Sequence, residues 1–325
     1  MIRSRIAAFA ALSGVLLLGA CGTSEKPSGA SGEQAGGPVT VTDSRDQKVK
    51  LKAPAKKVVA LEWGEAEMLV SLGVMPVGVA DVKGYASWVT AEKLDDSVKD
   101  VGTRAEPSVD SVVGLEPDLV VMEEGRGAAL VKQIEKYVPV VVTKGSDASD
   151  NLNRMRDDFR MIAKAVGKDA EVSRQLKDFD AALADAKQKI ADAGAAGRGF
   201  VMADGYSSGS AVSIRPFGDG ALVSQVAMQL GLKNVWTGKT DKVWGLGQTD
   251  VEGLTAIKDK DVKFLYNASA GDDVFGDDLK DNAIWKGLPF VKAGNVHRLS
   301  DGIWTFGGPA SCRQYAEELV KVYTT

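Results

Sequence analysis

Residues 169–194 read DAEVSRQLKDFDAALADAKQKIADAG, and this stretch decides how the rest of the chain is organised. Apolar side chains recur at three- and four-residue spacing from Val172 to Ile190, and no glycine or proline interrupts them before Gly194. The spacing predicts one helix of about 22 residues, roughly 33 Å long. Three heptads without sustained charge pairing favour a single rigid connector between two lobes over a coiled coil.

The segments on both sides of this helix have the pattern of α/β architecture. Short β-branched runs predict strands, and segments with helical spacing separate them. Strands are expected at 57–61, 77–80, 118–122, 138–143, 199–203, 262–267 and 296–299. Helices are expected at 65–72, 109–114, 128–137, 221–230, 251–257 and 311–323, and a further helical period starts at Asp150. We therefore predict two α/β lobes with mostly parallel sheets, residues 39–148 and 196–325, joined by connecting helices at 149–195.

The two lobes also resemble each other in one local motif. Residues 108–115, SVDSVVGL, precede the predicted strand 118–122, and residues 250–257, DVEGLTAI, precede the strand 262–267. Each motif pairs an acidic short helix with a β-rich strand. This repetition favours two lobes of related design.

The N-terminus has the layout of a secretory signal. Arg3 and Arg5 precede an apolar run from Ile6 to Leu18, which is shorter than the roughly 20 residues that span a bilayer. The sequence LLLGAC ends at Cys21 and looks like a bacterial lipobox, cut before the cysteine. We predict that residues 1–20 are a lipoprotein signal peptide and that Cys21 carries lipid. The alternative is a plain signal peptide whose junction contains cysteine.

A flexible tether is predicted at 21–38. Of the 17 residues from Gly22 to Pro38, 13 are Gly, Ser, Ala, Thr or Pro. Such a segment buries too little apolar surface to fold, and as a coil it spans about 20–25 Å. We expect a protein attached by lipid to the extracytoplasmic face of the cell membrane.

Composition excludes several functions. Without Arg3 and Arg5 the chain has 38 basic and 44 acidic residues, and this net negative charge argues against nucleic acid as a partner. His297 is the only histidine, so a metal site of several imidazoles is excluded, and we expect His297 to be structural. After lipidation of Cys21, Cys312 is the only remaining thiol and is expected to be buried.

No catalytic motif or phosphate loop is present, so no catalytic residue is predicted. Tryptophans and arginines instead lie in predicted loops at strand ends, where the clefts of α/β lobes form. Such a cleft suits a bulky ligand with carbon surface and oxygen acceptors. The candidate ligand-binding residues are Trp63, Trp88, Arg104, Trp244, Trp304, Arg215 and Tyr206 in the glycine-rich loop 205–209. An extracellular enzyme and an adhesion or signalling lipoprotein are the alternatives.

Several short stretches, in their order and spacing, resemble one known family over almost the whole mature chain. They are VVALEW at 58–63, LGVMPVGVAD at 72–81, VGTRAEP at 101–107, EPDL at 116–119, LGLKNVW at 230–236, WKGLPFVKAGNV at 285–296 and WTFGGPA at 304–310. The chain resembles the iron–siderophore-binding lipoproteins of ABC importers, class III substrate-binding proteins, and most of all their ferric hydroxamate-binding branch. The resemblance implies two α/β lobes joined by one long helix.

It also implies a ligand site. The family's ligand-binding arginine falls on Arg104 and its cleft tryptophan falls on Trp244, and Trp304 follows in the WTFG stretch at 304–307. The hydroxamate branch has a tyrosine after the strand 118–122, where this chain has Arg126 as the nearest match. A second arginine would favour a more anionic chelate. A ferric hydroxamate remains the leading ligand, with ferric citrate, a ferric catecholate, haem and cobalamin as alternatives.

The resemblance finally implies partners. Iron would enter only as part of the Fe(III)–siderophore ligand, without an intrinsic metal or other cofactor. An acidic residue on each lobe docks on the ABC transporter permease in this family, and the repeated motifs place these residues at Asp110 and Glu252. We expect a monomer.

Overall fold

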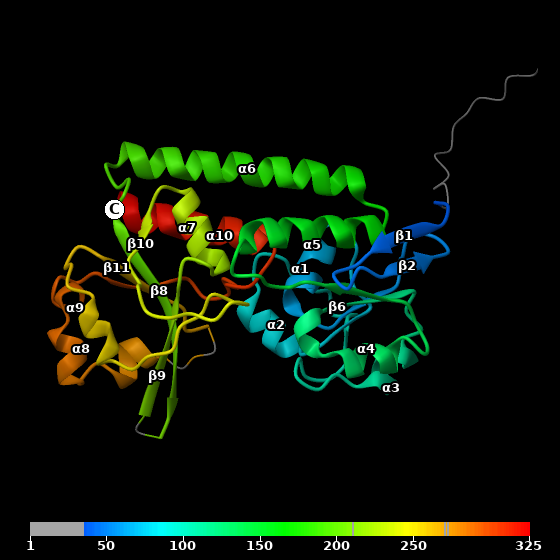
Figure 1. Ribbon diagram of the computed structural model, residues 1–325, viewed down its shortest axis with the longest axis horizontal. Coiled ribbons are helices and arrows are strands. Elements are labelled where there is room, and N and C mark those ends of the chain that lie inside the picture. Colours follow the sequence, from blue (N-terminus) through cyan, green and yellow to red (C-terminus); the bar gives the residue numbers. More distant parts are fainter. Residues whose placement is uncertain (1–35, 210, 270, 272) are drawn as a thin grey trace, which may run out of the picture. The chain divides into compact units, whose positions relative to one another are not determined.

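A computed structural model describes residues 36–209, 211–269, 271 and 273–325, and Figure 1 shows the arrangement of the elements. The predicted signal peptide, Cys21 and the tether up to residue 35 lie outside the described residues. Within the described ranges, no helix combines the length and the apolar character that crossing a membrane requires. The described chain begins with an antiparallel hairpin of β1 (Val39–Thr42) and β2 (Lys48–Leu51), which the sequence pattern did not predict.

A five-stranded parallel sheet with the order β5-β4-β3-β6-β7 forms the N-terminal lobe. Alternate residues of its central strands enter two separate cores: Val58 and Ala60 pack with α1 and α5, whereas Val59 packs with α3 and α4. The strand runs are therefore continuously apolar, as in other covered parallel sheets. The elements are β3 (Val58–Ala60), α1 (Trp63–Ser71), β4 (Gly78–Val79), α2 (Val82–Trp88), β5 (Lys99–Asp100), α3 (Val109–Gly114), β6 (Leu119–Glu123), the 3₁₀ turn η1 (Glu124–Arg126), α4 (Ala128–Ile134) and β7 (Val140–Thr143).

The C-terminal lobe repeats this plan with one antiparallel strand. Its sheet has the parallel order β10-β8-β11-β12, and β9 pairs antiparallel with β8. β8 runs to Ser208, so Tyr206, predicted in a loop, lies on a strand. The elements are β8 (Gly199–Ser208), β9 (Ala211–Phe217), α7 (Leu222–Gln229), β10 (Lys233–Asn234), the 3₁₀ turn η2 (Gly253–Ala256), β11 (Lys263–Tyr266), the π turn η3 (Val274–Asp278), α8 (Ala283–Gly287), α9 (Pro289–Lys292), β12 (Val296–Arg298) and α10 (Pro309–Thr324).

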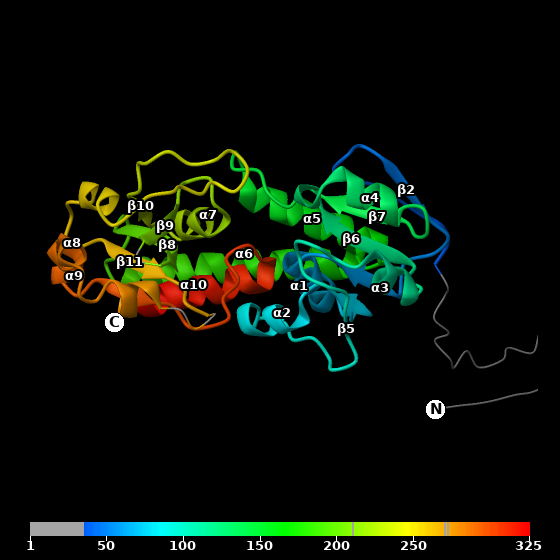
Figure 2. The ribbon, with the colours of Figure 1, turned by 90° about the horizontal axis from the view of Figure 1, so that it is seen from below.

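The predicted connector is α6 (Asp169–Asp192), a helix of 24 residues. It follows α5 (Asn151–Ala165) and packs against α5, α7 and α10, so one straight helix contacts elements on the sides of both sheets (Figures 1 and 2). The structure confirms the prediction of two α/β lobes with mostly parallel sheets joined by a long helix. Because the chain passes between the sheets along a helix and not through flexible strands, we expect only modest lobe closure.

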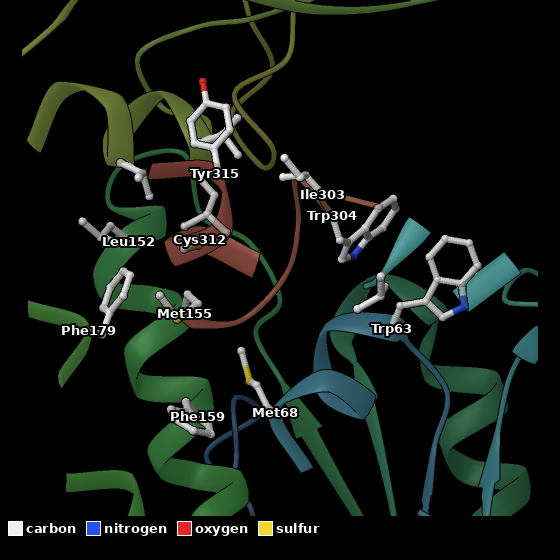
Figure 3. Packing of buried hydrophobic residues seen from close by; sticks show 14 of the residues in the cluster. Trp63, Met68, Leu152, Met155, Phe159, Phe179, Ile303, Trp304, Cys312 and Tyr315 are labelled. Carbon is white, nitrogen blue, oxygen red and sulfur yellow. The ribbon is translucent and has the colours of Figure 1, made fainter. Parts of the chain in front are cut away.

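Aromatic side chains fill the space between the three long helices. Phe159 of α5, Phe179 of α6 and Tyr315 of α10 are almost fully buried in one apolar cluster with Cys312, and Figure 3 shows part of this cluster. Cys312 is buried, as expected, and burial raises the pKa of its thiol. The same cluster continues to Trp63 and Trp304, so the core that holds the lobes together extends to the cleft.

Candidate functional site

The topology of each sheet places a crevice at the carboxyl ends of its central strands. In the N-terminal sheet the strand order reverses between β3 and β6, and in the C-terminal sheet it reverses between β8 and β11. Ligands of α/β sheets bind at such switch points. Glu62 follows β3, Glu123 ends β6, Asp204 lies on β8 and Asn267 follows β11.

Three adjoining cavities lie at these crevices. The first, of about 230 Å³, is called the inner pocket here; residues of both lobes line it, including Glu65, Arg104, Trp244 and Trp304. A second cavity of about 240 Å³ shares Arg104 and Trp304 with the inner pocket. A third, of about 620 Å³, is called the outer arm and is lined by Trp88, Asp204, Tyr206 and Arg215. Together they provide room for a ligand larger than a single amino acid or sugar.

Aromatic rings form a continuous wall along the cleft. The ring of Trp304 lies 4.9 Å from that of Trp63 and 5.2 Å from that of Phe306, both edge to face. Trp244 meets Phe306 at 5.3 Å and 88°, and Trp88 lies 6.0 Å from Trp304. Figure 3 shows Trp63 and Trp304 approaching each other from separate parts of the chain. The wall offers carbon surface to a ligand from both lobes.

Arg104 is held in the middle of this wall. Its guanidinium carbon lies 4.2 Å from the ring centre of Trp63 and 5.1 Å from that of Trp304, and its Nη2 lies 2.6 Å from Glu62 Oε1. Burial lowers the pKa of Arg104, although nearby carboxyl groups act in the opposite direction. Among the described residues, the buried Arg104 Nε and Trp304 Nε1 have no hydrogen-bond partner. Two N–H donors are therefore available at the cleft.

Arg126 occupies a different place from the one expected. It does not appear among the residues that line the three cavities. Its guanidinium forms an ion pair with Glu62, and its Nε lies 3.3 Å from Glu123 Oε1. Burial lowers its pKa. Arg126 is therefore paired with Glu62 and Glu123, and it does not provide the free cleft cation that would favour an anionic chelate.

Arg215 reaches the cleft from β9 and is also paired. Its Nε donates to Asp204 Oδ1 at 2.9 Å, and its guanidinium carbon lies 5.8 Å from the ring centre of Phe306. Arg215 lines all three cavities. Trp88 and Tyr206 line the outer arm, where the side chain of Tyr206 is exposed.

The sequence analysis missed the carboxyl groups of the inner pocket. Glu65, Glu123 and Asp158 line it and are buried. Glu65 accepts a hydrogen bond from Thr143 Oγ1 at 2.5 Å, and burial raises the pKa of Glu65, Glu123 and Asp158. A signal for Glu123 and for Glu62 was present, because each directly follows a buried apolar strand run. Glu65 and Asp158 lie on helices and carry no comparable signal.

The other predicted residues lie elsewhere. Asp110, in the first turn of α3, and Glu252, just before η2, are exposed, one in each lobe. His297 lies half-buried on β12, where burial lowers its pKa, and it does not line the three cavities.

Comparisons with known proteins agree with this architecture. The chain is 27% identical over 263 residues to the iron(3+)-hydroxamate-binding protein FhuD of Escherichia coli, covering 81% of this chain and 85% of that protein. It is 26% identical over 328 residues to the probable siderophore-binding lipoprotein YfiY of Bacillus subtilis, covering 97% of this chain and 96% of that protein. The crystal structure of the Fe³⁺–Desferal-bound siderophore-binding protein FhuD from Vibrio cholerae matches with a TM-score of 0.73 at 25% identity, covering 83% of this chain and 98% of that chain.

The family assignment rests on a match to a family over most of the chain. Residues 58–301, which include the central strands of both sheets and the long connecting helix, match the family described as periplasmic binding protein. This is a family of binding proteins and not of enzymes, and the two-lobed fold with one connecting helix described above is the class III periplasmic-binding fold. The chain belongs to the periplasmic binding protein family.

Proposed function

We propose that this protein is a lipid-anchored extracytoplasmic receptor that binds a ferric siderophore, of the hydroxamate type, and delivers it to an ABC importer. The observation that carries the proposal is the aromatic cleft around Arg104. A ferric siderophore presents carbon surface outside and oxygen acceptors around the metal. The wall of Trp63, Trp244 and Trp304 can pack against the carbon surface, and the N–H groups of Arg104 can donate hydrogen bonds to the oxygen acceptors.

The similar proteins support the ligand class. The relative from Escherichia coli is named for binding iron(3+)-hydroxamate, and the structure from Vibrio cholerae holds Fe³⁺–Desferal. The pairing of Arg104 with Glu62 adds a physical reason, because a ferric tris-hydroxamate core is neutral and requires donors without excess positive charge. Iron would be held by the chelator, and the protein would contact the chelator.

Delivery and anchoring complete the proposal. The lipobox ending at Cys21 and the glycine-rich segment after it suit a protein tethered beside a membrane transporter, and YfiY is named a lipoprotein. Asp110 and Glu252, one exposed acid on each lobe, would dock on basic pockets of the permease. One copy of the chain would act as a monomer, since one chain supplies both walls of the cleft.

Titration of intrinsic tryptophan fluorescence tests the ligand class. The purified protein is titrated with a neutral ferric hydroxamate, ferric citrate, a ferric catecholate, haem, cobalamin and ferric ion alone. Quenching by the ferric hydroxamate at micromolar or lower concentration is expected because four tryptophans line the cleft. Saturable binding of the bare ion, or turnover of a ligand without binding of any ferric chelate, would contradict the proposal.

A further inference from the structure

The loop that carries Trp244 is long and has little regular structure of its own. It joins β10 to η2, and residues 235–252, all of which the structure describes, form no helix or strand. Trp244 lies near its middle, lines the inner pocket and meets the ring of Phe306 edge to face. The position of this part of the aromatic wall therefore depends on the hydrogen bonds that hold the loop.

Asp241 shapes the loop from within. Its Oδ1 accepts hydrogen bonds from the backbone N–H groups of Val243 at 2.8 Å and of Trp244 at 2.6 Å. Its Oδ2 accepts from the backbone N–H of Leu246 at 2.9 Å. These bonds fix the form of the turn around Trp244, but they leave its distance from the N-terminal lobe to other contacts.

A second set of hydrogen bonds joins the loop to the N-terminal lobe. The backbone N–H of Ala148 donates to the carbonyl oxygen of Lys242 at 3.1 Å. Asn151 is the first residue of α5, which packs against α1 and β7 of the N-terminal lobe. Its Nδ2 donates to the carbonyl oxygen of Gly220 at 2.7 Å and, at a longer distance of 3.5 Å, to that of Val243. These bonds cross from one lobe to the other.

The protein itself uses the whole amide of Asn151. Its Oδ1 accepts from the hydroxyl of Ser146 at 2.9 Å and from the backbone N–H of Asp147 at 2.6 Å, while its Nδ2 faces the two carbonyl groups. An asparagine amide has two donor and two acceptor positions, so none is left for a ligand. Asn151 is 3% exposed and lines the inner pocket. We therefore expect it to act on a ligand through the residues that it holds.

Loss of the cross-lobe bonds would release the loop. The lobes approach so closely here that a Cβ on Gly220 would lie 2.5 Å from the carbonyl oxygen of Ala148. A buried carbonyl group that loses its donor is costly, so the two segments would separate until water reached that group. Val243 is 51% exposed, and the loop has little buried apolar surface here to resist such a movement. Trp244 would then move away from the inner pocket.

We propose that Asn151 is a positioning residue for ligand binding, which holds Trp244 at the wall of the inner pocket by hydrogen bonds across the two lobes. The proposal rests on the proposed function, because it concerns the same cleft. A wall that is fixed before the ligand arrives lowers the entropic cost of binding. Asn151 thus makes Trp244 part of a preformed site.

A double-mutant cycle tests this role. Calorimetry measures the affinity of wild-type protein, Asn151→Ala, Trp244→Ala and the double variant for the Fe³⁺–Desferal complex. Asn151→Ala should weaken binding about tenfold in the wild-type background and less than about threefold in the Trp244→Ala background, because it acts through Trp244. Asn153→Ala, at an exposed position in the same helical turn, is the matched control and should change affinity less than about threefold.

Asn151→Asp provides the test where Asn151→Ala does not fold. It keeps the acceptor for Ser146 and Asp147 but turns an acceptor toward the carbonyl groups of Gly220 and Val243. Because the donors to the C-terminal lobe are lost, Asn151→Asp should weaken binding at least as much as Asn151→Ala does.

A spectroscopic measurement follows Trp244 without any ligand. The chain has six tryptophans, so labelling with fluorotryptophan gives one fluorine NMR signal for each, and Trp244→Phe identifies the signal of Trp244. Asn151→Ala and Asn151→Asp should shift or broaden this signal in the ligand-free protein, and Asn153→Ala should not.

The two measurements separate this proposal from the proposed function. An unchanged Trp244 signal in both Asn151 variants, or an equal loss of affinity in both backgrounds, would overturn the positioning role of Asn151 and leave the proposed function standing. Wild-type protein that bound no ferric chelate would overturn the proposed function, and with it the role of Asn151 in binding, even where the Trp244 signal moved.

Discussion

The carboxylate of Glu67 on α1 accepts two hydrogen bonds from Ser311 in the first turn of α10, from the backbone N–H at 2.9 Å and from the hydroxyl at 2.6 Å. Neither residue has exposed surface. Because α1 belongs to the N-terminal lobe and α10 follows the C-terminal sheet, one lobe supplies the acceptor that caps a helix of the other. Gly307 permits this approach, since a Cβ there would lie 2.4 Å from Glu67 Oε2.

We predict that the hydrogen bonds between Glu67 and Ser311 stabilise the folded protein. Glu67→Ala leaves a buried N–H and a buried hydroxyl without an acceptor, so the free energy of unfolding should fall by about 2–4 kcal/mol. Ser311→Ala should cost less, and the double variant less than the sum of the two. Urea unfolding of the four proteins measures this. Strictly additive effects would show that the two side chains do not stabilise each other.

The burial of Glu67 also makes the stability of the protein depend on pH. Burial raises the pKa of Glu67 from 4.5 to about 7. The folded state thus holds this proton more tightly than the unfolded chain, so the associated stability is fully present below pH 4.5 and is lost as the pH rises through about 7. Between these values the wild-type protein should lose up to about 3 kcal/mol more than Glu67→Gln does. Parallel stability curves for the two proteins would contradict this assignment.

The ligand site predicts a ranking of three variants. Arg104→Ala removes charge-assisted donors and the contact with Trp63, so affinity for a ferric hydroxamate should fall about 10- to 150-fold. Trp244→Ala removes an aromatic wall and should cost a comparable amount. His297→Ala is the control and should leave affinity nearly unchanged. Isothermal calorimetry measures all three; a loss confined to His297→Ala would place the ligand elsewhere.

Much of the fold could be predicted from the sequence because buried parallel strands and amphipathic helices leave strong patterns. The helix predicted at 109–114 is α3, and the connector ends within two residues of its predicted boundary. The missed elements lack such patterns. α2 contains Gly84 and follows the capping residue Asp81, whose φ is 56°, and β9 contains Pro216, which is unusual in a strand. Their pairing and burial come from tertiary contacts.

The candidate site was less predictable, because ion pairs depend on which strands are neighbours. The sequence identified Arg104 and Arg126 as possible cleft cations, but β3 and β6 are adjacent only in the folded sheet. This adjacency brings Glu62 to both arginines and Glu123 to one of them. Residue types at strand ends therefore indicated where a cleft forms. Which arginines of the cleft are paired with carboxylates could be known only from the order of the strands in the folded sheet.

Membrane attachment through Cys21 is a further prediction. The sequence LLLGA, which resembles the start of a lipobox, directly precedes this cysteine, and Cys312, the other cysteine, is buried. Cys21→Ala should abolish labelling with a fatty-acid analogue in the host and release the protein into the medium or soluble fraction. Ser24→Ala in the predicted tether is the control and should remain labelled. Unchanged labelling and membrane retention of Cys21→Ala would contradict lipidation at this site.

Delivery to the permease can be separated from ligand capture. Asp110 and Glu252 are exposed acids in matching motifs of the two lobes, and neither lines the cleft cavities. Replacing both with arginine would place like charges against basic permease pockets and should weaken docking by several kcal/mol. The double variant should therefore bind the ferric siderophore with wild-type affinity and fail to support its uptake by cells.

Because a loss of net negative charge alone could disturb docking, Asp178→Arg with Asp185→Arg on the exposed side of α6 provides a control of equal charge change. Normal uptake by the Asp110 and Glu252 variant, or an equal loss in the control, would show that these acids do not form the docking pair.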